Sequence, residues 1–303
     1  MQLELKNIGM IKEATVKING LTVIAGENDT GKSTIGKVLC MLIKSIRWAS
    51  NTHSDNGQYV IQFNKYEELL FENQISDSGK INFKYKSVDF EYELIDNSCT
   101  NFKISTPFDN NLSKVHSPLL IETPFVWNLS KTMTSIAFNE LSSGIDFKVP
   151  LLLQDLFSAL NMELTEKYEF DLNISSIING NFKKRDYGDF FFEREGKEYR
   201  LTNVAMSIKY FGLLQVLENN GHLYRGQVLI LEEPEAHLHP KWQLEMAKII
   251  VELVKNGVKV VVNSHSSYMI DALKRYSKIE KIEDKTNFYL AENGHIDKVE
   301  EEQ

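Results

Sequence analysis

The sequence has little cysteine and proline and no long apolar run. Two cysteines among 303 residues cannot form a disulfide framework or a cysteine-rich zinc site. Six prolines and 16 glycines exclude a collagen-like or linker-dominated chain. No apolar stretch approaches the roughly 18 residues that cross a bilayer, and the first residues lack the apolar core of a signal peptide. We therefore expect a reduced, cytoplasmic protein that does not bind membranes.

Composition and charge indicate a folded, acidic protein. The net charge is −8, and 42% of the residues are hydrophobic, including 17 Phe and 12 Tyr. That content excludes a disordered chain, because it is enough to build a sizeable core. The length fits one large domain or two ordinary ones. An acidic surface argues against coating nucleic acid broadly, although it leaves room for a local basic groove.

The pattern of apolar residues predicts parallel-sheet material at both ends of the chain. Residues 21–25 are almost wholly apolar, as in a strand buried on both faces. Apolar positions from Ile35 to Ile46 then follow the period of a helix. The final third alternates helices and strands, with strands predicted at 227–232, 258–263 and 286–291. This order favours one α/β core over two separate domains.

The ends of the chain enclose a mixed segment. Residues 81–85 and 90–94 alternate apolar and polar side chains and predict antiparallel strands, like residues 3–18 at the N-terminus. Residues 49–57 and 97–114 are polar and predict loops. The remainder predicts a short strand at 117–125, helices over 130–172 and short strands over 176–202.

A glycine-containing loop follows the first buried strand. Gly26 to Thr34 matches G-x-x-x-x-G-K-[ST] in full and lies between a strand and an amphipathic helix, the context that the motif requires. Inward-pointing backbone N–H groups and the helix N-terminus would bind phosphates. Lys32 would reach the β and γ phosphates, and the Ser33 hydroxyl would bind Mg²⁺. The predicted nucleotide-binding residues of this loop are Gly26, Asn28, Asp29, Thr30, Gly31, Lys32, Ser33 and Thr34.

Two later buried strands end in polar side chains. One ends in Glu232 and Glu233, and the other ends in Asn263-Ser264-His265. In open α/β sheets, the carboxyl ends of such strands face the ligand crevice. We predict that Glu232 joins Ser33 at Mg²⁺, that Glu233 polarises the attacking water, and that His265 contacts the γ-phosphate or that water. The predicted catalytic residues are therefore Lys32, Glu233 and His265.

Three segments together, 26–34, 231–240 and 263–266, resemble the ABC-type ATPases of the SMC and Rad50 kind. They are most similar to a compact bacterial AAA-type branch. That branch includes the AbiEii-like proteins, the ATPase half of overcoming-lysogenization-defect nucleases and the Septu defence ATPase. The resemblance covers residues 1–48 and about 199–275. It implies a P-loop NTPase core of the ABC-ATPase head type, with a mixed sheet, helices on both faces, an antiparallel N-terminal sheet and an inserted, mainly helical subdomain.

The resemblance also implies a domain division and residue roles. Residues 1–303 would form a single head, with 1–48 and 199–303 as the nucleotide-binding core and 49–198 as an inserted β-hairpin and helical subdomain. Lys32 and Ser33 match the Walker A positions, Glu232 the Walker B acid, Glu233 the catalytic glutamate and His265 the switch histidine. Residues 235–239 match the D-loop, which crosses a dimer interface in such families. Glu122 is either a site-lining residue or a structural strand end.

This sequence departs from the family pattern at two places. Glu232 stands where the Walker B acid is usually Asp. In the signature motif, Met206 occupies the position of the phosphate-binding serine, and Ser207 occupies that of a glycine. A thioether cannot donate a hydrogen bond to a phosphate. Ser207 or Lys209 is the available substitute for contacting ATP in the partner subunit, and slow hydrolysis is a reasonable expectation.

From the motifs we expect an ATPase that uses ATP and Mg²⁺. The resemblance implies that it forms a homodimer around ATP and regulates a separately encoded effector, such as a nuclease or toxin, in bacterial anti-phage defence. Few residues follow the last predicted strand, so nuclease activity would come from that partner. Two alternatives stay open. One is an ATP-gated scaffold or sensor with negligible turnover; the other is a DNA-binding, SMC-like ATPase in DNA repair, for which the basic clusters are 183–185 and 274–281.

Overall fold

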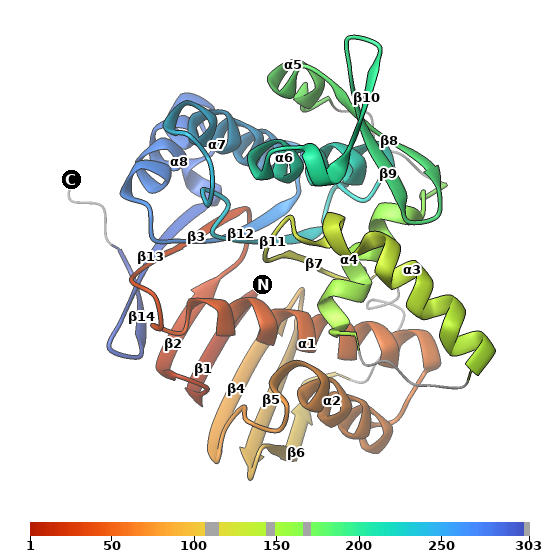
Figure 1. The fold of residues 1–303 in the computed structure, drawn as a ribbon. Helices are drawn as coiled ribbons and strands as arrows, with labels where there is room; N and C mark the ends of the chain where they lie inside the picture. The colour runs from red at the N-terminus through yellow and green to blue at the C-terminus, as the bar shows by residue number, and fades with distance from the viewer. Residues whose placement is uncertain (107–114, 144–148, 166–170, 300–303) are drawn as a thin grey trace.

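The structure is a computed structural model that describes residues 1–106, 115–143, 149–165 and 171–299. Its centre is an 11-stranded mixed sheet, which runs through the whole molecule (Figure 1). The strand order across this sheet is β6-β5-β4-β1-β2-β14-β13-β3-β12-β11-β7. A separate three-stranded sheet has the order β10-β9-β8. These features confirm the predicted mixed sheet.

The helices and strands have the following bounds. The strands of the large sheet are β1 (Gln2–Ile8), β2 (Ile11–Lys17), β3 (Leu21–Ala25), β4 (Ser78–Tyr85), β5 (Val88–Ile95), β6 (Ser98–Ile104), β7 (Leu119–Ile121), β11 (Val228–Glu232), β12 (Lys259–Ser264), β13 (Thr286–Glu292) and β14 (His295–Lys298). The small sheet contains β8 (Asn181–Asp186), β9 (Asp189–Arg194) and β10 (Lys197–Arg200). The α-helices are α1 (Lys32–Thr52), α2 (Asn56–Phe71), α3 (Val126–Ser143), α4 (Leu151–Asn161), α5 (Ile174–Ile178), α6 (Met206–Asn219), α7 (Pro240–Lys255) and α8 (Ser267–Ile279). The described residues also include the 3₁₀ turns Leu201–Asn203 and Glu283–Lys285.

Strand β3 lies between β12 and β13 and is parallel to both. Strands β11 and β7 continue the parallel half, each parallel to its neighbour. Successive side chains of a strand point to opposite faces, and here both faces are covered. In β11, Leu229 and Leu231 join one hydrophobic cluster, whereas Val228 and Ile230 join the other. The almost wholly apolar sequences of these strands follow from burial on both faces.

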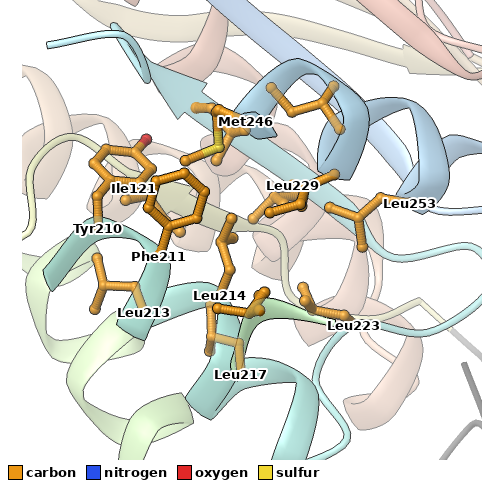
Figure 2. Packing of buried hydrophobic residues seen from close by; sticks show 14 of the residues in the cluster. Ile121, Tyr210, Phe211, Leu213, Leu214, Leu217, Leu223, Leu229, Met246 and Leu253 are labelled. Atoms are coloured by element: carbon orange, nitrogen blue, oxygen red, sulfur yellow. The ribbon is translucent and has the colours of Figure 1, made fainter. Parts of the chain in front are cut away.

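The two faces of the sheet carry different helices. Helices α6, α7 and α8 cover one face. Figure 2 shows side chains of α6 and α7 meeting strand residues Ile121 and Leu229. Helix α1 runs across the other face, with α2 beside it over the antiparallel strands β4 to β6 (Figure 1). The small sheet packs against α6 and α3, and Phe182 of β8 stacks on Trp127 of α3 with ring centroids 5.3 Å apart.

The structure corrects three local predictions. Residues 98–104 form strand β6, although their polar sequence predicted a loop; as an edge strand, β6 exposes most of its side chains. Helix α1 continues to Thr52, and α2 begins at Asn56 behind a capping box made by Asp55 and Gln58, so the predicted loop at 49–57 is only a short link. Strand β14 was not predicted. Part of the predicted 97–114 loop, residues 107–114, lies outside the described residues.

Within the described part of the chain, every helix is too short or too polar to cross a membrane.

Candidate nucleotide site

The loop from Gly26 to Gly31 joins β3 to α1 in a conformation that depends on glycine. Gly31 has a φ of 88° and Gly26 a φ of 155°. A Cβ on Gly26 would lie 2.5 Å from the Ala291 carbonyl oxygen, and one on Gly31 would lie 2.8 Å from Cγ1 of Ile11. Both glycines therefore allow close packing of the loop as well as unusual dihedral angles. Asp29, with a φ of 65°, supplies a third left-handed position.

The side chain of Lys32 lies inside this loop. Its ammonium donates a hydrogen bond to the carbonyl oxygen of Gly26 at 2.8 Å and another to that of Glu27. Lys32 is 6% exposed. Burial lowers the pKa of its ammonium, and the nearby carboxylates of Glu233, Glu232 and Glu235 oppose that shift. The loop therefore holds this positive charge with two carbonyl oxygens, which phosphate oxygens would have to replace.

Ser33 and Glu232 face each other across the loop and the end of β11. The Ser33 hydroxyl donates a hydrogen bond to Oε2 of Glu232 at 2.8 Å, and the Asn263 side-chain amide donates to Oε1 at 2.7 Å. Asn263 also donates to the Lys32 carbonyl oxygen at 3.0 Å. Burial raises the pKa of the Glu232 carboxyl; the charges of Glu122 and Glu233 add to this rise, whereas the two hydrogen bonds lower it. Glu122 thus lies within electrostatic reach of the site.

The glutamate at position 232 is accommodated by a glycine of α1. A Cβ on Gly36 would lie 3.1 Å from Oε1 of Glu232 and 3.0 Å from Cγ2 of Ile230. The absence of a side chain at Gly36 leaves space for the extra methylene that distinguishes Glu from Asp. Gly36 therefore makes room for Glu232 at a position where Asp is usual.

Glu233 and His265 form an exposed pair at the ends of β11 and β12. Nδ1 of His265 lies 3.2 Å from Oε1 of Glu233, and the two side chains are 47% and 39% exposed, respectively. Glu233 has a φ of 45°, so the chain turns sharply after β11. Its backbone N–H donates a hydrogen bond to the Asn263 carbonyl oxygen at 2.8 Å. The turn directs Glu233 away from buried Glu232, which separates the two adjacent carboxylates.

A cleft of about 710 Å³ opens beside the loop. Gly26, Asn28, Thr30 and His265 line it. The opposite wall is the end of β13 and the turn into β14, residues 290–293. This wall was not predicted, because β14 is short and the sequence around its turn carries no recognised motif. Asn293-Gly294 was the available signal, since that pair favours a tight hairpin.

The structure thus brings most of the predicted site residues together. Lys32, Ser33 and Thr34 lie in the first turn of α1. Asp29 is exposed at the outside of the loop, and the Thr30 hydroxyl donates a hydrogen bond to the Glu27 carbonyl oxygen at 2.8 Å. Ser207 lies at the start of α6. The residues that line the cleft do not include Ser207, nor do they include Lys32, Ser33, Glu232 or Glu233.

Lys209 cannot replace the missing signature contact in this conformation. It is 4% exposed, and its ammonium donates a hydrogen bond to Oδ1 of Asn128 at 2.8 Å. Its carbonyl oxygen accepts a hydrogen bond from the indole N–H of Trp127 at 2.9 Å. The contacts with α3 therefore hold Lys209 in place, and Ser207 is the remaining candidate for the signature contact with ATP.

Sequence reasoning missed the importance of Glu235. This carboxylate is 5% exposed, and its Oε1 accepts hydrogen bonds from the Ser264 hydroxyl at 2.6 Å and from the backbone N–H groups of His265 and Ser266 at 3.2 Å each. The motif Glu233-Pro234-Glu235 contained the residue, but no sequence pattern indicated that its side chain turns inward to meet β12.

Comparisons with known proteins agree with this geometry. Residues 205–270 match the model of the AAA ATPase domain. The chain is 22% identical to the Septu protein PtuA of Bacillus thuringiensis over 302 residues, covering 89% of this chain and 72% of the relative. It is also similar to an SMC head bound to the C-terminal winged-helix domain of ScpA, with a TM-score of 0.57, 13% identity and coverage of 98% and 96% of the two chains.

Two further SMC heads support the same fold. The head domain from Thermotoga maritima gives a TM-score of 0.50 at 12% identity, covering 100% of this chain and 98% of that one. An SMC head bound to the C-terminal domain of ScpA, from Pyrococcus furiosus, gives 0.52 at 12% identity, covering 98% and 95%. The chain therefore has the fold of an SMC-type ATPase head, and its residues 205–270 match the AAA ATPase domain.

Proposed function

We propose that this protein binds ATP with Mg²⁺ at residues 26–34 and hydrolyses the bond between the β and γ phosphates. One observation carries the proposal: Lys32, the Ser33–Glu232 contact and the Glu233–His265 pair meet at the carboxyl ends of β3, β11 and β12. This is the position of ligands in open α/β sheets. The match to the AAA ATPase domain supports the same activity.

The residues present fit Mg²⁺ held jointly by protein and nucleotide. Ser33 and Glu232 supply oxygen atoms 2.8 Å apart. Within the described residues there is no group of three or more His, Cys, Asp or Glu side chains placed to bind a metal. Mg²⁺ typically takes one or two protein oxygens and completes its shell with phosphate and water. When bound, the ion would neutralise charge on the phosphate oxygens.

Each protein group then has a defined task. Lys32 exchanges its carbonyl partners for phosphate oxygens and offsets their charge. Glu233 accepts a hydrogen bond from the attacking water and orients it toward the γ-phosphorus. His265, 3.2 Å from Glu233, holds that carboxylate or donates to the γ-phosphate, depending on its tautomer. Asn263 fixes Glu232 and the start of α1 together.

We further propose that residues 1–303 act as a single head, with 1–48 and 199–303 binding the nucleotide. Two copies would close around ATP, with Ser207 of each head contacting the nucleotide of the other. The likeness to a Septu protein motivates a role in anti-phage defence, in the cytoplasm, through a separate effector protein.

The decisive experiment compares three variants with wild type. Lys32→Ala should lose ATP binding, and Glu233→Gln should bind ATP but lose about 100-fold or more in turnover, since it removes the group that orients water. The matched control is Glu252→Gln, which changes an exposed glutamate on α7. Its ATP binding and turnover should equal those of wild type. Wild-type turnover in both Lys32→Ala and Glu233→Gln would exclude this site as the ATPase centre.

Solution mass measured with and without ATP tests assembly in the same samples. A dimer that Glu233→Gln traps with ATP supports the sandwich arrangement. A monomer under every condition contradicts it.

The second candidate function is an ATP-gated scaffold. The observation in its favour is Met206, which stands where a phosphate-binding serine is expected, while Lys209 is fixed by Asn128. ATP-dependent assembly with background turnover in wild type, and restored turnover in Met206→Ser, would support it.

Direct DNA binding is less well supported. Lys183 pairs with Glu193 at 2.8 Å and Arg185 pairs with Glu198, so two charges of the 183–185 cluster are already neutralised within the small sheet. The Lys184 ammonium donates a hydrogen bond to the Asn161 carbonyl oxygen at 2.8 Å.

A further inference from the structure

Glu235 is a buried carboxylate whose two oxygens have different surroundings. Oε1 accepts hydrogen bonds from the Ser264 hydroxyl and from the backbone N–H groups of His265 and Ser266. The imidazole Nδ1 of His265 lies 3.7 Å from the same oxygen. Oε2 is equally buried but has no hydrogen-bond partner. The groups that Glu235 contacts belong to β12 and the link that follows it, so these contacts act on the protein.

These contacts determine where the His265 backbone lies. Residues 264–266 form the link between β12 and α8, and the Ser266 side chain caps α8 by accepting from the Met269 N–H. One carboxylate oxygen therefore ties the turn after β11 to the start of α8. Hydrogen bonds to a charged acceptor are stronger than neutral ones. The position of His265 beside Glu233 consequently depends on Glu235.

We propose that Glu235 is a positioning residue: by holding the backbone of His265, it keeps the imidazole beside Glu233. The inference rests on the proposed ATPase function for its catalytic consequence only.

Amide hydrogen exchange without nucleotide tests the positioning role independently of activity. In Glu235→Ala the N–H groups of His265 and Ser266 should exchange about tenfold faster or more, because they lose their acceptor. Glu235→Gln retains an oxygen acceptor and should remain within about threefold of wild type. Unchanged exchange in Glu235→Ala would overturn the proposal.

Steady-state kinetics provide the second readout. Glu235→Ala should lower kcat about tenfold or more and leave KM for ATP within about threefold, because the residue orients a catalytic group and does not touch the nucleotide. The matched controls are Glu252→Gln and Tyr276→Phe, on α7 and α8. A raised KM with an unchanged kcat would contradict positioning. If wild type has no turnover, the proposed function fails, and the exchange experiment still decides the role of Glu235.

Discussion

At the scale of single residues, the buried carboxylates of this protein differ in how many hydrogen bonds offset the cost of their burial. Glu232 and Glu235 are buried and accept several hydrogen bonds each. Glu67, on α2, is 1% exposed, and its Oε1 has no hydrogen-bond partner. Burial raises the pKa of Glu67 to about 7. A residue of this kind makes stability depend on pH near neutrality.

The sign of that dependence follows from the proton count. The folded protein holds a proton on Glu67 up to about pH 7, whereas the unfolded chain releases it near the ordinary glutamate pKa of 4.5. Between these values the folded state binds more protons, so the free energy of unfolding falls as pH rises through this window. Glu218, whose pKa burial also raises to about 7, contributes with the same sign.

We therefore expect Glu67→Gln to flatten the pH profile of stability and to stabilise the protein above pH 7. Urea unfolding between pH 4.5 and 8 measures this, with exposed Glu68→Gln as the control. A profile of Glu67→Gln that is as steep as that of wild type would show that this carboxyl is not responsible. Because Glu218 remains, part of the slope should persist.

The sequence identified many of the residues that meet at the site, but not the contacts between them. Lys32, Ser33, Glu232, Glu233 and His265 carry recognisable spacing, since each lies next to a buried apolar strand. The role of Glu235 was not predictable, because hydrogen bonds between segments distant in sequence leave no periodic pattern. The space for Glu232 likewise comes from Gly36, on a different element.

At the scale of elements, glycines in helices show how tertiary packing outweighs local propensity. Gly57 and Gly212 both lie in α-helices, where glycine is less favourable than alanine by about 1 kcal/mol. A Cβ on Gly57 would meet only Oδ1 of Asp55 at 3.4 Å. A Cβ on Gly212 would lie 2.3 Å from Cε2 of Phe182, in the small sheet.

The same substitution should therefore have opposite effects in α2 and α6. Gly57→Ala should stabilise the protein by about 0.5 to 1 kcal/mol. Gly212→Ala should destabilise it by about 1–3 kcal/mol, since the buried ring of Phe182 has to move. Urea unfolding measures both. Stabilisation in Gly212→Ala would mean that the small sheet moves away from α6 at little cost.

Element prediction succeeded where burial imposed a pattern. The buried strands β3, β11 and β12 and the amphipathic helices α1 and α7 were all predicted near their observed positions. Strands β6 and β14 were missed because an exposed or short strand carries few apolar residues to alternate. Their formation depends on pairing with β5 and with β13, which sequence alone did not indicate.

At the scale of the whole molecule, one sheet serves two hydrophobic cores. Neighbouring residues of β11 point into different cores, so neither core is complete without the strand that both share. Cooperative unfolding is the expected result. The resemblance and the buried strands predicted this architecture, whereas the order of 11 strands came only from the structure.

Unfolding should therefore be a single transition on both sides of the sheet. Trp48 packs against one core. Trp127 belongs to the other core, and Trp242 packs against it. Fluorescence of Trp48→Phe and of a Trp127→Phe/Trp242→Phe variant reports the two sides separately. Leu229→Ala and Ile230→Ala, which face opposite cores, should each lower stability by about 2–5 kcal/mol. Each should shift both signals together; separate transitions would indicate two folding units.

The place of β3 in the sheet determines when the nucleotide site can exist during protein synthesis. This strand carries the loop at residues 26–31, yet its two neighbours are β12 and β13, from the last part of the chain. A ribosome adding about 5–20 residues per second needs on the order of 10 to 50 seconds to make the sequence between them. During that time the loop has no partner strands, no Glu232 and no His265. The ATP site therefore cannot form gradually as the chain grows. ATP can bind in the proposed manner only after β11, β12 and β13 have been translated.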